Sequence, residues 1–404
     1  MLPPLFGLKM EVIMARKKRI DKKFLELTKE IDIEKFRDSV KSEFHNITDL
    51  RDSKRIKYPA WYVTLVILCG YLAGCNTIED IADYSSLKGA WFSELTGTTY
   101  GGPCYNTIWW FLVRLEPQAF KQLLTNWFQR LPRDLVGQLL VIDGKRLRGV
   151  SKDKYITHLV ELFAAQDRLV IAQAKVPDKK GEAQALPELL DAVDIKGAIV
   201  SFDALYTHIE ETQQVRKRGA HFIAGIKGNQ PKLHDETMNY FEQAYSVDYE
   251  GVDVDRFQSC EKGHGRIEER KICVSKNIDW LPQKEEWELK ALIEVRSKRL
   301  IKGKSETATR YYGASCEGSA KQFAGWIREH WSIENNLHWV ADVVFKEDAS
   351  LGDTGHSAEN MSLIRRLAMN IIQVFDGERG ISAARRCATH SPEYLRGLLG
   401  KVFC

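Results

Sequence analysis

Two aspartates that end short apolar runs are the residues of this chain best suited to chemistry. Asp143 ends the run Gln138–Asp143 (QLLVID), and Asp203 ends the run Gly197–Asp203 (GAIVSFD). A carboxylate at the end of a buried strand costs free energy unless it is paired or binds a metal ion. If the two strands are neighbours, both carboxylates meet at one edge of a sheet. The alternative is that each aspartate caps the turn that follows it, and the sequence leaves both interpretations open.

A third carboxylate, Glu334, lies in a segment with helical spacing that runs from Gln322 to Phe345. At about 100° per residue, one apolar stripe is predicted, and Glu334 lies about a quarter turn away from it. The predicted stripe consists of Trp326, Ile333, Leu337, Val340 and Val344. His330 and His338 flank the glutamate at i−4 and i+4. We expect these histidines to face phosphate or water, because Mg²⁺ prefers oxygen ligands.

Three carboxylates would form an oxygen-only ligand set, which favours Mg²⁺ or Mn²⁺. Two such ions about 4 Å apart can activate a water or a sugar hydroxyl and stabilise the leaving oxygen of a phosphodiester. Basic residues follow the first acid closely, at Lys145, Arg146 and Arg148. They could grip flanking phosphates, or they could form a solvated turn. Lys227 and Asn229, after the last strand-like run, are further candidates for phosphate contact.

The elements that must position these residues alternate between strand-like and helical patterns after Pro132. Strand-like runs are predicted at residues 138–143, 158–166, 168–176, 197–203 and 221–226, with helices at 182–193 and 207–218. Continuous apolar runs of this kind predict a mixed sheet covered on both faces. Residues 236–318 interrupt the alternation as an inserted β-rich piece, and helical spacing returns at 321–345 and 357–375.

The preceding part of the chain is predicted to be mostly helical. Pro59–Cys75 is predicted as a buried helix, Asn76–Tyr84 as a capped one, and Asn106–Trp127 as a helix pair broken near Pro117. The predicted division is a basic N-terminal arm (1–30), a helical domain (31–131), a catalytic core in two parts (132–235 and 319–385), the insertion (236–318) and a tail (386–404). Trp331 and Trp339 are predicted to lie in the core rather than to stack on bases.

Composition excludes several classes of protein. The 404 residues are 44% hydrophobic, which excludes a disordered chain. The net charge of +4 does not by itself indicate a binding partner. Eight cysteines without a C-x-x-C pair indicate reduced thiols and a cytoplasmic protein. The longest apolar run, Trp61–Cys75, is shorter than the ~20 residues that span a membrane. The basic run Arg16–Lys23 is either a solvated tail or an arm along phosphate.

Five motifs together resemble a known family. They are VIDGKRLRG (141–149), SFDALYTH (201–208), AGIKGNQ (224–230), EKGHGRIEER (261–270) and HWSIENNLHWVADVVFKED (330–348). In this order they resemble the DDE transposases of insertion sequences, specifically the H-repeat-associated family, whose catalytic core carries a β-strand insertion before the last glutamate. The resemblance runs from about residue 30 to residue 380 and includes the family's helical N-terminal domain.

The resemblance implies an α/β, RNase H-like core with Asp143 on the first strand, Asp203 after the fourth and Glu334 on the following helix. It implies two Mg²⁺ ions (or Mn²⁺) at these acids, and double-stranded DNA, both transposon ends and target, as the substrate. It also implies a homodimer or higher assembly, and contacts from His264 and Arg266 to the transposon end. His330 stands where the wider group tends to carry an arginine.

The expected function is metal-dependent DNA cleavage and strand transfer in a prokaryotic, nucleoid-associated protein. An RNase H-like nuclease without strand transfer and an inactive DNA-binding remnant remain alternatives. Arg365 and Arg366 on the last predicted helix are further candidates for DNA contact.

Overall fold

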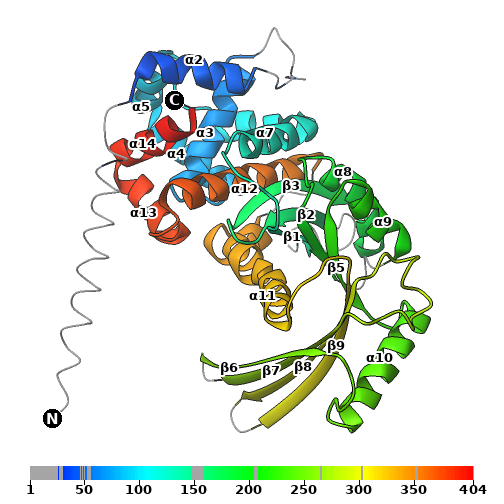
Figure 1. Ribbon diagram of the computed structural model, residues 1–404. Coiled ribbons are helices and arrows are strands. Elements are labelled where there is room, and N and C mark those ends of the chain that lie inside the picture. The colour runs from blue at the N-terminus through cyan, green and yellow to red at the C-terminus, as the bar shows by residue number, and fades with distance from the viewer. Residues whose placement is uncertain are drawn as a thin grey trace, which may run out of the picture. The chain divides into compact units, whose positions relative to one another are not determined.

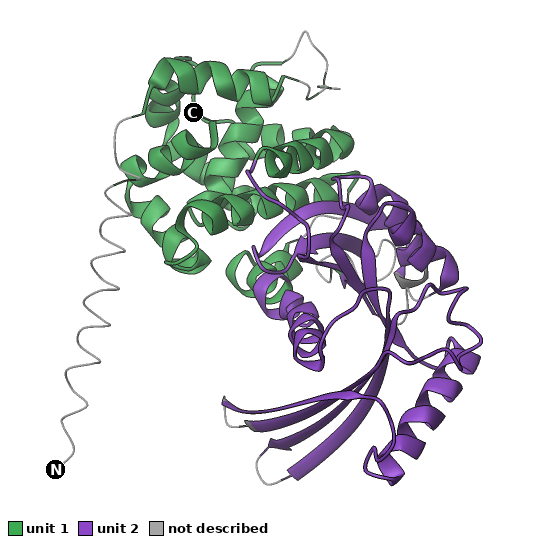
Figure 2. Ribbon diagram, in the orientation of Figure 1, with its two compact units in different colours: residues 1–130, 146–157, 338–404 green, residues 131–145, 158–337 purple. Residues whose placement is uncertain are grey.

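The structure is a computed structural model that describes most of the chain. It describes residues 31–45, 56–147, 158–203, 208–263, 266–301, 304–350 and 354–403, together with Glu26, Ile47, Asp49 and Arg51. The chain forms two compact units (Figure 2). One holds residues 1–130, 146–157 and 338–404, and the other holds residues 131–145 and 158–337. The basic run Arg16–Lys23 lies outside the described residues.

The first unit is helical where it is described (Figure 1). Its helices are α2 (Ile33–Glu43), α3 (Ala60–Leu72), α4 (Ile78–Leu87), α5 (Gly89–Thr96), α6 (Tyr105–Arg114), α7 (Gln118–Gln129), α12 (Ser357–Asp376), α13 (Ile381–His390) and α14 (Pro392–Phe403). The predicted buried helix is confirmed in α3, where every residue except Trp61 is buried. The predicted cap is confirmed too, because Thr77 and Asp80 form a capping box at the start of α4.

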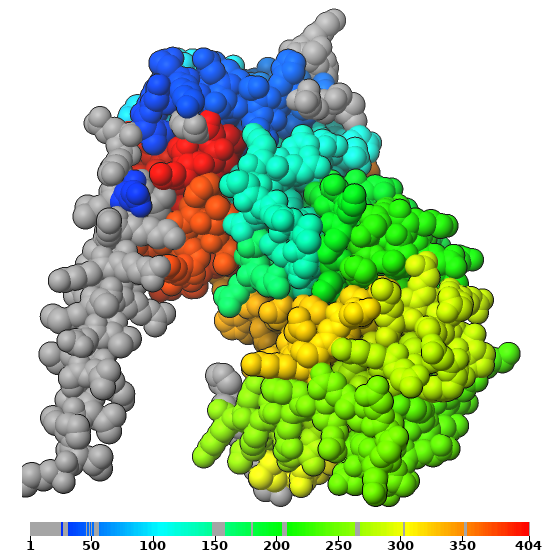
Figure 3. All heavy atoms as spheres, viewed as in Figure 1, coloured from blue at the N-terminus to red at the C-terminus, as the bar shows by residue number. Residues whose placement is uncertain are grey.

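The centre of this unit comes from the far end of the sequence. Helix α12 packs against α3, α6 and α7 of the N-terminal half, and also against α13 and α14. The last residues, for which the sequence predicted a tail, form α14, which packs on α2; Figure 3 shows this red end of the chain beside the blue α2. The helical unit is therefore assembled from both ends of the sequence.

The second unit is built on one nine-stranded sheet with the order β3-β2-β1-β4-β5-β9-β8-β7-β6. The strands are β1 (Leu139–Arg146), β2 (His158–Ala164), β3 (Leu169–Val176), β4 (Ile199–Phe202), β5 (His221–Ile226), β6 (Asp255–Gly263), β7 (Arg266–Ser275), β8 (Ala291–Ile301) and β9 (Lys304–Ala314). β1, β4 and β5 are parallel, whereas β2 pairs antiparallel with β3. The predicted α/β fold with a mixed sheet is confirmed. It has the RNase H-like arrangement, with the first aspartate on β1 and the second directly after β4.

The β-rich insertion is continuous with this sheet. β9 pairs antiparallel with β5, and β8, β7 and β6 follow outward as an antiparallel ribbon. A helix that the sequence analysis did not predict, α10 (Pro231–Ser246), precedes these strands. The predicted helix at 182–193 is shorter than expected, because a 3₁₀ segment, η2 (Lys179–Ala185), leads into the five-residue α8 (Leu186–Leu190).

Helices cover both faces of the sheet, as the apolar strands predicted. Successive residues of a strand point to opposite faces. On β9, Tyr311 stacks on Phe241 of α10, with ring centroids 6.2 Å apart. Its neighbour Tyr312 lines a hollow together with Ile327 of α11 (Ala320–His330). α10 and α11 therefore lie on opposite sides of β9.

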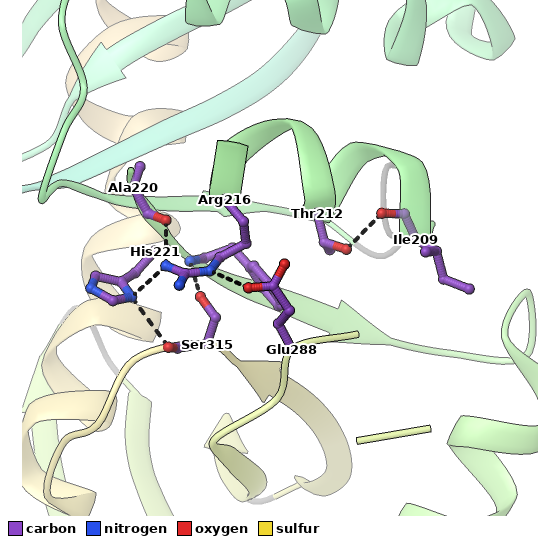
Figure 4. A network of polar contacts seen from close by, with 8 residues as sticks. Ile209, Thr212, Arg216, Ala220, His221, Glu288 and Ser315 are labelled. Carbon is purple, nitrogen blue, oxygen red and sulfur yellow. Dashed lines mark hydrogen bonds and ion pairs between the residues drawn. The ribbon is translucent and has the colours of Figure 1, made fainter. Parts of the chain in front are cut away.

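A polar network fixes the start of β5 (Figure 4). Arg216 of α9 (Ile209–Lys217) donates to the carbonyl of Ala220 at 2.8 Å and pairs with Glu288 at 3.0 Å. It also lies 3.1 Å from Nδ1 of His221, whose pKa is lowered by burial and by this guanidinium. The network anchors the strand whose far end carries Lys227.

The buried cysteines are expected to be unreactive in the native protein. The described cysteines are all free. Burial raises the pKa of Cys75 and Cys273 to about 12 and that of Cys316 to about 11, whereas hydrogen bonds to Thr107 lower the pKa of the exposed Cys104. Because the thiolate is the nucleophile, iodoacetamide should alkylate Cys104 first, as read by peptide mass spectrometry, and Thr107→Ala should slow that reaction. If Cys75 were labelled as fast as Cys104 in the folded protein, this expectation would be wrong.

Candidate active site

Asp143 and Asp203 lie at corresponding positions on neighbouring parallel strands. The register of β1 and β4 pairs Ile142 with Phe202, so each aspartate is the next residue along its chain. Adjacent strands are about 4.8 Å apart. Both carboxylates therefore belong to the same edge of the sheet. One detail differs from the prediction: Asp143 does not end its strand, because β1 continues to Arg146.

The second aspartate has a cationic partner. Nζ of Lys227, directly after β5, lies 3.1 Å from Oδ1 of Asp203. The side chains are 58% and 40% exposed respectively, so the pair is open to solvent. At such an exposed pair the attraction is partly screened. An incoming cation can therefore compete with Lys227 for Asp203, and an incoming phosphate can compete with Asp203 for Lys227.

Glu334 is exposed and lines a groove of about 620 Å³ beside α11. Four arginines line the same groove: Arg270, Arg299, Arg310 and Arg328. A second hollow contains Asp203 and Lys227. The two adjoin, because Arg310, Tyr312, Ile327 and Trp331 line both. The second and third acids thus open onto connected surfaces of one unit.

The helix that carries Glu334 is not the continuous α-helix that the sequence predicted. α11 ends at His330, and Glu334–His338 forms a π-helical turn, η4, followed by a second one, η5 (Val340–Val344). Hydrogen bonds to the fifth residue widen these turns. As a result the fully buried positions recur every fourth residue, at Ile333, Leu337, Ala341 and Phe345. The predicted stripe is therefore wrong at Val340 and Val344, which are only half-buried, and Trp326 is only half-buried as well.

The two tryptophans of this segment are exposed. Trp331 is 39% and Trp339 is 54% exposed, so the prediction that they lie in the core is wrong. The guanidinium of Arg310 lies 5.5 Å from the ring centroid of Trp331. This places an aromatic face and a cation together where the groove and the hollow adjoin.

His330 makes a specific contact inside the unit. Its Nδ1 lies 2.7 Å from Oγ of Ser201 on β4. Burial lowers the pKa of His330 to about 4, although the charge of Asp203 acts in the opposite direction. The imidazole is therefore neutral near pH 7 and offers a phosphate no full positive charge.

The other predicted DNA contacts are placed as follows. Arg146 and Asn229 are exposed, whereas Lys145 is only 6% exposed within β1. His338 is half-buried at the end of η4, and Arg266 is the first residue of β7. Arg148 and His264 lie outside the described residues.

Arg365 and Arg366 are not available for DNA contact, so that prediction is wrong. Both are fully buried within the helical unit, at 1% and 0% exposure. Arg366 forms a bidentate pair with Glu347 at 3.0 and 2.9 Å. Their charge on a predicted helix suggested exposure, and only the packing of α12 shows that they are internal.

The sequence analysis missed a buried pair beside the first aspartate. His158 of β2 and Glu182 of η2 contact each other and are 5% and 4% exposed. Both side chains also pack closely against Gly144. A Cβ at this position would lie 2.6 Å from Cδ of Glu182 and 2.8 Å from Nε2 of His158. The glycine after Asp143 is therefore required by a close approach, which explains the IDG triplet.

Gly144→Ala is expected to destabilise the protein by about 1–3 kcal/mol, because the added methyl group overpacks this contact. Thermal unfolding followed by circular dichroism measures the change. Gly228→Ala is the matched control, since a Cβ there meets nothing within 4 Å. Equal midpoints for the two variants would show that the pair moves aside freely.

The donor chemistry of the acids suits a hard divalent cation, since all their ligand atoms are oxygens. Within the described ranges, no three His, Cys, Asp or Glu side chains are grouped closely enough to hold a metal ion. The strand register brings two of the acids to one edge. The third lies on the adjoining groove.

Comparisons with known proteins identify the family of this chain. The family described as "Transposase DDE domain" matches residues 135–371, and the one described as "DDE_Tnp_1-associated" matches residues 41–128. "H repeat-associated putative transposase YhhI" of Escherichia coli strain K12 is 31% identical over 366 residues, covering 87% of this chain and 95% of the relative. "Putative transposase YncI" of Escherichia coli O157:H7 is 30% identical over 363 residues, covering 87% and 92%.

Among solved structures, the chain is similar to the cryo-EM structure of the piggyBac transposase synaptic complex with hairpin DNA. The TM-score is 0.44 at 11% identity, and the match covers 94% of this chain and 79% of that one.

The mixed sheet and the matched families together define the class of this protein, which is a DDE transposase. The chain belongs to the DDE transposase family, within its H repeat-associated branch. It is therefore an enzyme of DNA transposition, from a family that acts on DNA and generally uses divalent metal ions. Of the helices in the described ranges, none is long and apolar enough to cross a membrane.

Proposed function

We propose that this transposase cuts and joins the ends of its own insertion sequence with two Mg²⁺ ions held by Asp143, Asp203 and Glu334. The observation that carries the proposal is the register of β1 and β4, which puts Asp143 and Asp203 side by side. The groove of Glu334 supports it, because four of its lining residues also line the hollow of Asp203.

Bound Mg²⁺ would activate the attacking oxygen and stabilise the leaving oxygen of the phosphodiester. The chain's own residues position the reactants. β1 and β4 hold the two aspartates at a fixed separation. Lys227 balances the charge of Asp203 before the reaction, and its exposed ammonium is then available to a DNA phosphate.

The residues proposed to contact DNA differ in how exposed their side chains are. Lys227, Asn229 and Arg146 are exposed and are the strongest candidates among the described residues. Arg148, His264, Arg266 and His338 remain proposals on the resemblance of their motifs. The low exposure of Lys145 and the neutral imidazole of His330 favour structural roles at the edge of the site. Because two ends must be joined, we propose a homodimer or higher assembly on DNA.

The test uses the full chain and end-labelled double-stranded DNA that carries the element's terminal sequence. We expect nicking at the end in Mg²⁺, none in EDTA, and joined products when target DNA is added. Nicking without joined products would indicate a nuclease. Binding without nicking in either Mg²⁺ or Mn²⁺ would indicate an inactive remnant.

A further inference from the structure

One hydrogen bond joins the two elements that carry the second and third acids. Oγ of Ser201, on β4, lies 2.7 Å from Nδ1 of His330, the last residue of α11. The two residues are 129 positions apart in the sequence, and Ser201 is 3% exposed. The contact is therefore a tertiary one, shielded from water on the serine side.

The positions of the two residues relate them to the acids. Ser201 precedes Asp203 by two residues, and alternate residues of an extended chain face the same side. His330 precedes Glu334 by four residues, so about one helical turn separates the end of α11 from the acid. The hydrogen bond thus connects the strand and the helical segment close to both acids.

The helix needs such an anchor at this position. α11 ends at His330, and the π-helical turn that starts at Glu334 follows within one turn. π-Helical turns are rare and short. A contact that fixes the end of α11 therefore also fixes the position of the π-helical turn that begins at Glu334.

We propose that the Ser201–His330 hydrogen bond is a clamp that sets the separation of the Asp203 and Glu334 carboxylates. Both are positioning residues, which act on the metal ions through the acids. The inference rests on the proposed function, since it takes the two acids as metal ligands. Losing one hydrogen bond of this kind is expected to change metal affinity about tenfold.

The test measures Mn²⁺ binding to the full chain by isothermal titration calorimetry, without DNA and without turnover. Ser201→Ala and His330→Ala should each weaken binding about tenfold, and the double variant should be no weaker than either one. His330→Asn, whose amide can take the place of Nδ1, and Ser201→Thr should restore most of the affinity. His234→Ala is the control, because His234 lines the same hollow but contacts Asp235 of its own helix.

Two results separate the clamp from the function on which it rests. If Asp203→Asn weakens Mn²⁺ binding but the two alanine variants do not, or if their effects add, the clamp is wrong and the ligand assignment stands. If Asp203→Asn leaves Mn²⁺ binding unchanged, the ligand assignment fails and the clamp fails with it. Where an alanine variant unfolds, Ser201→Thr and His330→Asn provide the test instead. Mn²⁺ affinity equal to that of the wild type supports the clamp, and a tenfold loss of Mn²⁺ affinity in both variants overturns it.

Discussion

Asp203→Asn should lower end cleavage by about 10³-fold or more while leaving DNA binding intact. The change removes a charged oxygen ligand, and a metal ion stabilises a phosphoryl transition state by several kcal/mol. It also leaves Nζ of Lys227 without the carboxylate that lies 3.1 Å away. Single-turnover cleavage of labelled end DNA and a gel-shift titration measure the two properties separately. Asp143→Asn and Glu334→Gln should behave in the same way.

The control for this experiment is Asp191→Asn. Asp191 is an exposed acid of the same unit, paired with Arg218 at 2.6 Å. We expect its cleavage rate to stay within about twofold of wild type, because exposed pairs contribute little. Cleavage that survives in Asp143→Asn, Asp203→Asn or Glu334→Gln would show that the acid in question is not a metal ligand.

Glu347→Leu should lower the free energy of unfolding of the helical unit by about 3–5 kcal/mol. Glu347 and Arg366 are both 0% exposed at the side chain, and Arg365 lies 3.8 Å from the same carboxylate. Removing the acid leaves buried guanidinium charge without its partner, which is far more costly than losing a surface pair. Differential scanning calorimetry of the full chain should show the transition of this unit at a markedly lower temperature.

The matched comparison is Glu94→Leu, which breaks an exposed pair with Arg396 in the same unit. A loss of at most about 1 kcal/mol is expected there. The double change Glu347→Leu with Arg366→Met should recover part of the loss, because it removes both members of the buried pair. If Glu347→Leu is as stable as Glu94→Leu, the buried pair does not stabilise the unit.

Local patterns in the sequence were enough to predict the core strands and several of the helices, although not α10 or α14. The apolar runs that end near Asp143 and Asp203 are strands of the sheet, and α3 is buried over nearly its whole length as predicted. These features can be predicted locally, because the pattern of an apolar run and the capping of a helix are set by residues close in the sequence. The metal-binding role of the acids stays a prediction.

Pairing between distant segments was decided only by the tertiary structure. No local pattern shows that β9 adds to β5, so that the insertion extends the core sheet, or that α12 packs among the N-terminal helices. The same is true of Arg366, whose charge predicts exposure until Glu347 is seen beside it. The His330–Ser201 bond likewise joins residues 129 positions apart. The sequence by itself determined the apolar strands of the core and the buried helix α3, but not α10 or the π-helical turn that carries Glu334. Which elements meet depends on packing energies summed over the whole chain, and these are available only from the folded structure.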